Sequence, residues 1–157
     1  MRKTFKEILI EHALMDEKIV FLTGDLGFEF NEFKDKFPHR YFNMGVCEQT
    51  MIGSASGMAL EGLKPFIYSI TPFLLERPFE QIKIDIDHQK ANVVLVGYAD
   101  YPGMGPTHAE LDWKTISPLF KNTKFYFPET KQDVINAIRD TQTYNGPAVL
   151  ILKKAKD

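Results

Sequence analysis

The segment 43–59, NMGVCEQTMIGSASGMA, places an acid, Glu48, in the first turn of a predicted helix that follows a short strand. The helix dipole stabilises a carboxylate there by about 0.3–1 kcal/mol, so position alone favours a structural role. The same carboxyl group could exchange protons with a ligand if it were shielded from water. A nucleophilic Cys47 with His108 as its base is the weaker alternative, because a cysteine at an apolar helix start is usually a small buried residue.

The second candidate for chemistry is His108, which follows the glycine- and proline-rich loop 97–106. The loop comes after a predicted buried strand, and ligands of parallel α/β sheets bind at such strand ends. A lone histidine is more often a surface or capping residue, and Thr107 is an alternative helix cap. The run 85–88, DIDH, points its carboxylates to different sides of a predicted helix, which indicates a solvated face. No metal site is assigned to side chains of this chain.

The composition argues against several functional classes. The 157 residues include 19 Lys and Arg against 21 Asp and Glu, and the charges are scattered, so no footprint for nucleic acid or an anionic membrane is visible. The single cysteine cannot form an internal disulfide, and no apolar run reaches the roughly 20 residues of a membrane helix. Phosphate-binding motifs of the Walker or GxGxxG type are missing from the sequence. We expect one cytoplasmic domain spanning residues 1–157.

Strand and helix patterns alternate along the chain. Apolar runs predict strands at 18–23, 40–43, 65–70, 92–97, 123–127 and 147–152. Helical patterns cover 4–15, 29–37, 47–61, 74–89, 108–120 and 130–143. Continuous apolar strands separated by helices predict an α/β fold with a doubly wound, mainly parallel sheet and helices on both faces. Within 47–61, Gly53, Ser54 and Gly57 predict the close approach of another element, in tight packing or at a subunit interface.

The same residues carry a resemblance to a known family. The fragments that carry it are Gly24-Asp25-Leu26, RYFNMGVCEQ at 40–49, MIG at 51–53, GMA at 57–59, PF at 65–66, FLLER at 73–77, FEQI at 79–82, LVG at 95–97 and GPTH at 105–108. In this order and spacing they resemble the pyrimidine-binding domain of the transketolase family over essentially the whole chain. The resemblance implies a single pyrimidine-binding domain and thiamine diphosphate as cofactor.

The resemblance also implies roles for individual residues. The glutamate aligned with Glu48 hydrogen-bonds the aminopyrimidine ring of the cofactor and promotes its imino form, which forms the ylide that attacks a carbonyl. Phe73 and Phe79 would pack against the pyrimidine, and Asp25 would lie nearby. Glu76 stands near the pyrimidine, where the family often has a small or aromatic residue. His108 would face the substrate as a proton donor or oxyanion partner, so Glu48 and His108 are the predicted catalytic residues.

Family active sites lie between this domain and a diphosphate-binding domain that supplies magnesium and phosphate contacts. The resemblance therefore implies a separate diphosphate-binding partner subunit that holds the Mg²⁺, in a heterotetramer of two copies of each chain. This chain alone is expected to be inactive. Its substrates would be small carbonyl compounds, and neither nucleic acid nor membrane is an expected partner.

Departures from the family pattern concern the substrate. Phe28, Glu29 and Phe30 follow the position of a phosphate-binding serine, and a carboxylate there would repel phosphate. Polar sugar contacts of the family correspond to positions near Met104 and Phe127. We therefore expect a transketolase-like transferase subunit acting on a ketose or 2-oxo substrate other than the standard pentose phosphates. The alternatives are a β-type subunit of a 2-oxo-acid decarboxylase or dehydrogenase, and a non-catalytic regulatory subunit.

Overall fold

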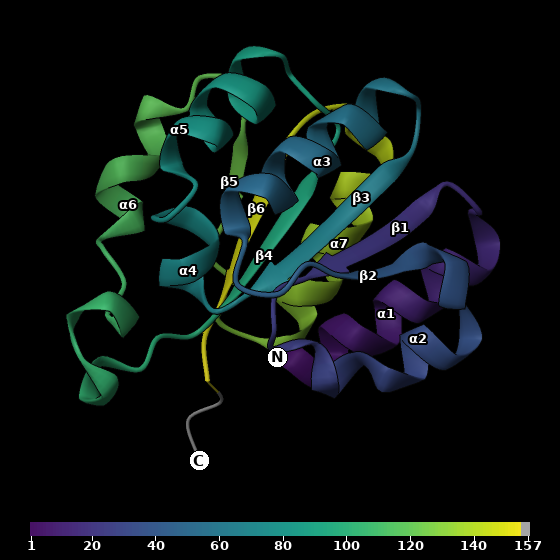
Figure 1. Cartoon of the computed structure of the whole chain (residues 1–157), viewed down its shortest axis with the longest axis horizontal. Helices are drawn as coiled ribbons and strands as arrows, with labels where there is room; N and C mark the ends of the chain where they lie inside the picture. Colours follow the sequence, from purple (N-terminus) through teal and green to yellow (C-terminus); the bar gives the residue numbers. More distant parts are fainter. Residues whose placement is uncertain (155–157) are drawn as a thin grey trace.

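A computed structural model describes residues 1–154 of the chain and shows an α/β fold built on one parallel sheet (Figure 1). Its six strands lie in the order β2-β1-β3-β4-β6-β5. The strands are β1 (Ile19–Thr23), β2 (Tyr41–Asn43), β3 (Lys64–Ser69), β4 (Val94–Tyr98), β5 (Lys124–Tyr126) and β6 (Ala148–Leu152). The predicted parallel, doubly wound sheet is therefore confirmed, and every predicted strand is present within one or two residues of its expected bounds.

Helices cover both faces of the sheet (Figure 1). They are α1 (Arg2–Met15), α2 (Asn31–Lys36), α3 (Glu48–Leu60), α4 (Thr71–Leu75), α5 (Phe79–Gln81), α6 (Trp113–Ile116) and α7 (Lys131–Thr143). On one face, α1 and α7 pack over inward-facing Phe21, Phe66 and Tyr68. On the other, α3 packs over Leu22 and Ile67. Alternate strand residues thus enter two separate cores, which explains why β1 reads as an unbroken apolar run.

Two predicted helices are shorter and more broken than expected. The range 74–89 divides into α4, α5 and a π-helical segment (Ile82–His88). Pro78 precedes α5, and a proline lacks the N–H that a continuous helix needs. The range 108–120 holds only α6 and a 3-10 turn (Ser117–Leu119), because Pro118 interrupts it in the same way and residues before α6 are not helical. His108 ends a 3-10 turn (Pro106–His108) rather than beginning a helix.

The predicted solvated face at 85–88 is wrong for Asp87, which is buried. Its carboxylate accepts bonds from the backbone N–H groups of Lys121 (3.2 Å) and Asn122 (2.9 Å) and from the Thr123 hydroxyl (2.7 Å). These bonds tie the π-helical segment to the chain that enters β5. A carboxylate with this many donors has a structural role.

We expect Asp87→Ala to lower the free energy of unfolding by about 2–4 kcal/mol, because three donors would lose their buried acceptor. Chemical denaturation of the purified chain measures this loss. Asp85→Ala is the matched control, since Asp85 uses its backbone carbonyl, not its carboxylate, to accept the bond from Ser56 Oγ (2.8 Å). Equal destabilisation by the two variants would contradict the role assigned to the Asp87 carboxylate.

Within residues 1–154, Gly53 and Gly57 of α3 do not pack against another element. Gly53 and Gly57 are exposed, and a Cβ atom added at either position would meet nothing within 4 Å. Cys47, expected to be a small buried residue, is exposed at the start of the same helix. Of the two explanations for the small residues, tight packing inside the domain is therefore wrong, and a subunit interface stays a prediction.

In residues 1–154, no helix combines the length and the apolar character that crossing a membrane requires.

Candidate functional site

Glu48 lies at the start of α3, where the chain turns after β2 at the carboxyl edge of the sheet. The turn uses Gly45, whose positive φ of 64° suits glycine, and the Gly45 N–H donates to Asn43 Oδ1 at 2.9 Å. Glu48 is only 5% exposed in this chain. A buried carboxylate at a helix N-terminus is held in one place, and it needs a hydrogen-bond partner.

That partner is Arg77, which sequence analysis did not single out. Arg77 Nη1 donates to Glu48 Oε1 at 2.7 Å, and the guanidinium carbon lies 3.4 Å from the centre of the Phe73 ring. The guanidinium group is flat and carries N–H donors, so it stacks on the ring while it binds the carboxylate. Glu48 and Phe73, which are distant in sequence, thus contact the same flat group, one at its edge and the other at its face.

His108 lies against the same Phe73 ring. The two ring centres are 4.7 Å apart in an edge-to-face arrangement. The Thr107 hydroxyl lies 3.1 Å from His108 Nδ1. When that hydroxyl donates to Nδ1, the proton of the neutral imidazole sits on Nε2, where it is free for a ligand.

Two bonds fix the loop that carries His108. The Tyr101 N–H donates to the His108 carbonyl at 2.8 Å and closes the loop on itself. Glu76 Oε1 accepts the Leu111 N–H at 2.9 Å, which ties the end of α4 to the chain just beyond His108. The positions of Phe73 and His108 are therefore coupled through both ring contact and backbone anchoring.

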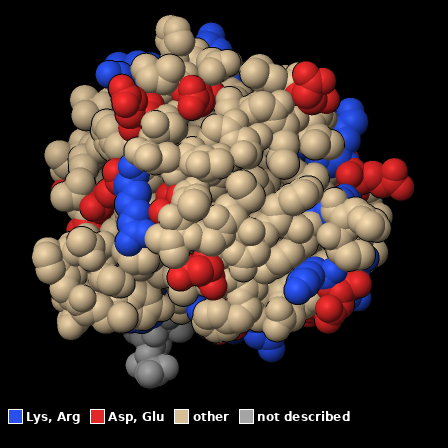
Figure 2. Space-filling model, viewed as in Figure 1, with Lys and Arg blue, Asp and Glu red and all other residues tan. Residues whose placement is uncertain are grey.

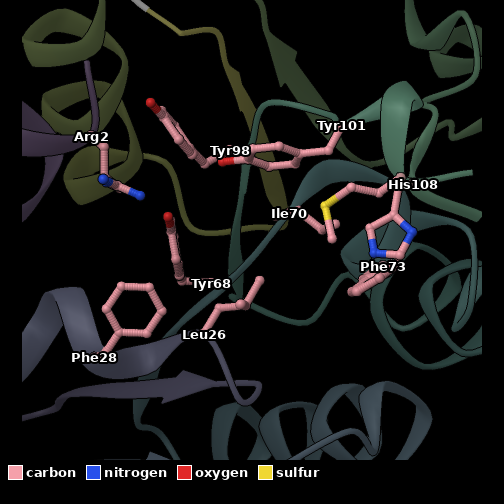
Figure 3. Close-up of a pocket in the computed structure, with 10 residues that line it drawn as sticks. Arg2, Leu26, Phe28, Tyr68, Ile70, Phe73, Tyr98, Tyr101 and His108 are labelled. Carbon is pink, nitrogen blue, oxygen red and sulfur yellow. The ribbon is translucent and has the colours of Figure 1, made fainter.

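Beside Phe73 and His108 is a pocket of about 240 Å³ (Figure 3). It opens at the carboxyl ends of β1, β3 and β4, where the sequence predicted that a ligand would bind. The residues that line it are Arg2, Leu26, Phe28, Tyr68, Ile70, Phe73, Tyr98, Tyr101, Met104 and His108. Figure 3 shows Arg2 at one end of the pocket and His108 at the other.

The structure brings together three of the six predicted site residues: Glu48, Phe73 and His108. Asp25 is exposed and does not line the pocket. One carboxylate oxygen of Glu76 accepts a hydrogen bond from the backbone N–H of Leu111. Phe79 packs instead in an aromatic cluster with Trp113 (ring centres 6.3 Å apart) and Phe120 (5.4 Å). The roles of Asp25, Glu76 and Phe79 toward a cofactor stay predictions.

Arg2, Tyr68 and Arg77 belong to the site but were not found from the sequence. Tyr68 carried a usable signal, because it is a hydroxyl-bearing residue near the end of an otherwise apolar strand run. Arg2 and Arg77 carried none, since each is one charged residue among many and is brought to the site only by tertiary structure.

The residues present fit a flat heterocycle such as the aminopyrimidine of thiamine diphosphate. The Arg77 guanidinium itself shows that a flat group with N–H donors can stack on Phe73 and bond to Glu48. Within residues 1–154 no group of three or more His, Cys, Asp or Glu side chains is placed to hold a metal ion. The described residues therefore offer contacts for an aromatic ring and a carbonyl compound.

Comparison with known proteins identifies the family of the chain. The family model described as "Transketolase, pyrimidine binding domain" matches residues 1–156. A 1-deoxy-D-xylulose-5-phosphate synthase of Clostridium perfringens is 31% identical over 161 residues, which cover 98% of this chain and 25% of that protein. A 6-deoxy-6-sulfo-D-fructose transketolase subunit of Clostridium sp. is 30% identical over 159 residues, covering 97% of this chain and 49% of that protein. The chain thus spans between a quarter and a half of the length of these relatives.

Solved structures give the same result. The structure described as a split-gene transketolase in an inactive β4 tetramer has a TM-score of 0.87 and 26% sequence identity, covering 98% of this chain and 51% of that one. The fold, the placement of Glu48, Phe73 and His108 at one edge of the sheet, and the match along the sequence lead to one assignment. The chain belongs to the transketolase family, whose members use thiamine diphosphate, as a pyrimidine-binding domain.

Proposed function

We propose that this chain is the pyrimidine-domain subunit of a split, thiamine diphosphate-dependent enzyme that makes or breaks a C–C bond next to a carbonyl group. The substrates are ketoses or 2-oxo compounds other than the standard pentose phosphates. Support comes from relatives that are themselves called transketolase subunits. The observation that carries the proposal is the series of contacts that links Glu48 through Arg77 and Phe73 to His108.

Each of these residues has a separate task. Thiamine diphosphate, when bound, supplies a nucleophilic carbon and an electron sink for carbonyl chemistry. Glu48 would share a proton with the aminopyrimidine ring, and its burial keeps water from competing for that proton. Phe73 would present its face to the ring. His108, with Nε2 free, would donate a proton or hydrogen bond to the substrate oxygen on which negative charge develops.

A partner subunit would complete the site. The surface over α3 is largely uncharged in Figure 2, whereas charged side chains lie over α4, α5 and α6. Leu60 on α3 is 64% exposed, and Val46 in the turn before α3 is 63% exposed. The same helix carries Gly53 and Gly57, where a Cβ atom would meet nothing within 4 Å. We propose that a diphosphate-binding subunit, carrying the Mg²⁺ and phosphate contacts, covers this surface in a two-plus-two assembly. The split-gene relative is described as inactive in its β4 form, and we propose the same for this chain alone.

The proposal is tested by isolating the chain with its partner. A tagged chain expressed in its native host should recover a stoichiometric second protein, and the complex should retain thiamine diphosphate when dialysed with Mg²⁺. The separated chain should retain none. The complex should then transfer a two-carbon unit from hydroxypyruvate to an aldehyde, measured by CO₂ release and product mass. A stoichiometric complex that neither retains the cofactor nor releases CO₂ would support the regulatory alternative instead.

The Arg77 guanidinium occupies the two contacts that this proposal gives to the aminopyrimidine, so the cofactor has to displace it. We expect Arg77→Met in the assembled complex to bind thiamine diphosphate about tenfold more tightly, because an ion pair and a cation–π contact no longer compete. Isothermal titration calorimetry measures the change. Lys83→Met, at an exposed position on the π-helical segment, is the control. Weaker binding in Arg77→Met would show that Arg77 holds the cofactor instead of yielding to it.

A further inference from the structure

The pocket has a reactive end and a remote end. His108 and Phe73 lie at one end, and Arg2 lies at the other (Figure 3). If the proposed function holds, the substrate carbonyl sits near His108 and the rest of the molecule extends toward Arg2. We propose that the pocket selects carbonyl substrates whose remote end is uncharged and largely apolar, and that Glu29 determines this specificity by neutralising Arg2. The inference rests on the proposed function in one respect, which is the orientation of the substrate with its carbonyl group toward His108.

Among the described residues that line the pocket, Arg2 is the only one with a permanent charge. That charge is already paired, since Arg2 Nη2 donates to Glu29 Oε1 at 2.9 Å. The guanidinium carbon also lies 4.6 Å from the centre of the Tyr98 ring, which fixes the side chain on a second side. Glu29 comes from the 3-10 turn Gly27–Phe30 and does not line the pocket itself. A phosphate entering at this end would have to displace the Glu29 carboxylate or stand beside it.

The neighbouring cations do not compensate for this pair. Lys3 and Lys6 lie on α1 next to Arg2, but they line an adjoining hollow and not this pocket. Each has a carboxylate of its own, because Lys3 Nζ lies 3.9 Å from Glu7 and Lys6 Nζ lies 3.8 Å from Glu32. The remote end of the pocket therefore offers little net positive charge to an anionic group.

The walls between the two ends are rings and alkyl groups. Leu26, Ile70 and Phe28 supply apolar surface, and Tyr98 and Tyr101 supply ring faces and hydroxyls. Burial raises the pKa of Tyr68, so its hydroxyl stays neutral at physiological pH. A dry cavity of about 150 Å³ accommodates benzene, so a pocket of this size has room for a ring or a short alkyl chain. Such a group gains contact here, whereas a phosphate finds no free cation.

Binding of two probes to the full-length chain tests the inference without any turnover. The uncharged probe is 4-phenylbutan-2-one, and the charged probe is dihydroxyacetone phosphate. Chemical-shift changes of the Tyr68 and Tyr98 rings in NMR titrations report on occupancy and affinity. We expect the wild-type chain to bind the uncharged probe at least about tenfold more tightly than the phosphate.

The variant Glu29→Gln frees Arg2 and should raise affinity for dihydroxyacetone phosphate about tenfold, through a charge-assisted bond to the guanidinium. Affinity for 4-phenylbutan-2-one should stay within about twofold, since no apolar wall changes. Adding Arg2→Met to Glu29→Gln should abolish the gain. Glu61→Gln, which removes an exposed glutamate at the end of α3 and far from Arg2 in the sequence, should alter neither affinity.

Preference of the wild-type chain for the phosphate, or a Glu29→Gln variant with an unchanged ratio of affinities, would overturn the inference. These failures differ from failure of the proposed function. An assembled complex that forms no C–C bond would overturn the function and leave the binding preference intact. An active complex whose wild-type chain prefers the phosphate probe would overturn only the specificity assigned to Glu29.

Discussion

Glu48→Gln should lower turnover by the assembled enzyme by about 10²–10⁴-fold, the range lost when a positioned acid–base group is removed. The amide keeps the shape of the side chain, so helix α3 and the surrounding contacts persist. What disappears is the ability to share a proton with a ring nitrogen, because an amide neither takes up nor releases one at physiological pH. Steady-state kinetics of wild-type and variant complexes, each saturated with thiamine diphosphate, measure the loss.

The control for this variant is Glu61→Gln at the other end of α3, where the side chain is exposed. It should leave activity within about twofold of the wild type, as is usual for surface substitutions. Both variants should unfold at the wild-type temperature when the complex is heated. Activity of Glu48→Gln within a few-fold of the wild type would remove Glu48 from the chemistry and with it the enzyme assignments.

His108→Asn should reduce kcat by about 10²–10³-fold, which is the typical cost of losing one donor to a developing oxyanion. Asparagine keeps a polar group near the position of Nδ1, but its shorter side chain has no donor where Nε2 lies and it cannot supply a proton. Because the imidazole does not contact Glu48, loss of its edge contact with Phe73 should weaken binding of thiamine diphosphate by no more than about tenfold. Steady-state rates over a range of donor-substrate concentrations separate the loss in kcat from any change in KM.

His88→Asn is the matched control, since His88 is exposed at the end of the π-helical segment. It should not alter kcat. The interpretation of His108 would be wrong if His108→Asn raised KM strongly while kcat stayed at the wild-type value, because that pattern indicates uniform binding of substrate and transition state.

The four central strands of the sheet, β1, β3, β4 and β6, were predictable because they are buried on both sides. Runs such as Ile19–Leu22 and Val93–Val96 have no polar residue to suggest an exposed face, and only a strand covered by two layers of helix reads that way. The broken helices were harder to predict. Apolar periodicity continues across Pro78 and Pro118, so the pattern indicated one helix where the missing N–H groups permit only short segments.

The candidate site was predictable only where chemistry and sequence position coincide. Glu48 and His108 stand in unusual sequence contexts at strand ends, and the structure places both at the carboxyl edge of the sheet. The role of Arg77 could not be predicted, because it depends on a contact with Glu48, which is 29 positions away in sequence. The Arg2–Glu29 pair, 27 positions apart, was hidden for the same reason.

The strand order has a consequence for how the chain acquires its pocket. Pocket residues follow or belong to β1, β3 and β4, and β1 pairs with β3 from Ile19 opposite Lys64 onward. Parallel pairing of this kind brings together segments far apart in sequence, so chain entropy must be lost before the contacts form, and folding is slow. A nascent or truncated chain lacking β4 would leave Phe66 and Tyr68 paired with β1 on one side only. Ligand binding at this edge is therefore a probe of complete folding, suited to distinguishing native chain from collapsed intermediates during expression.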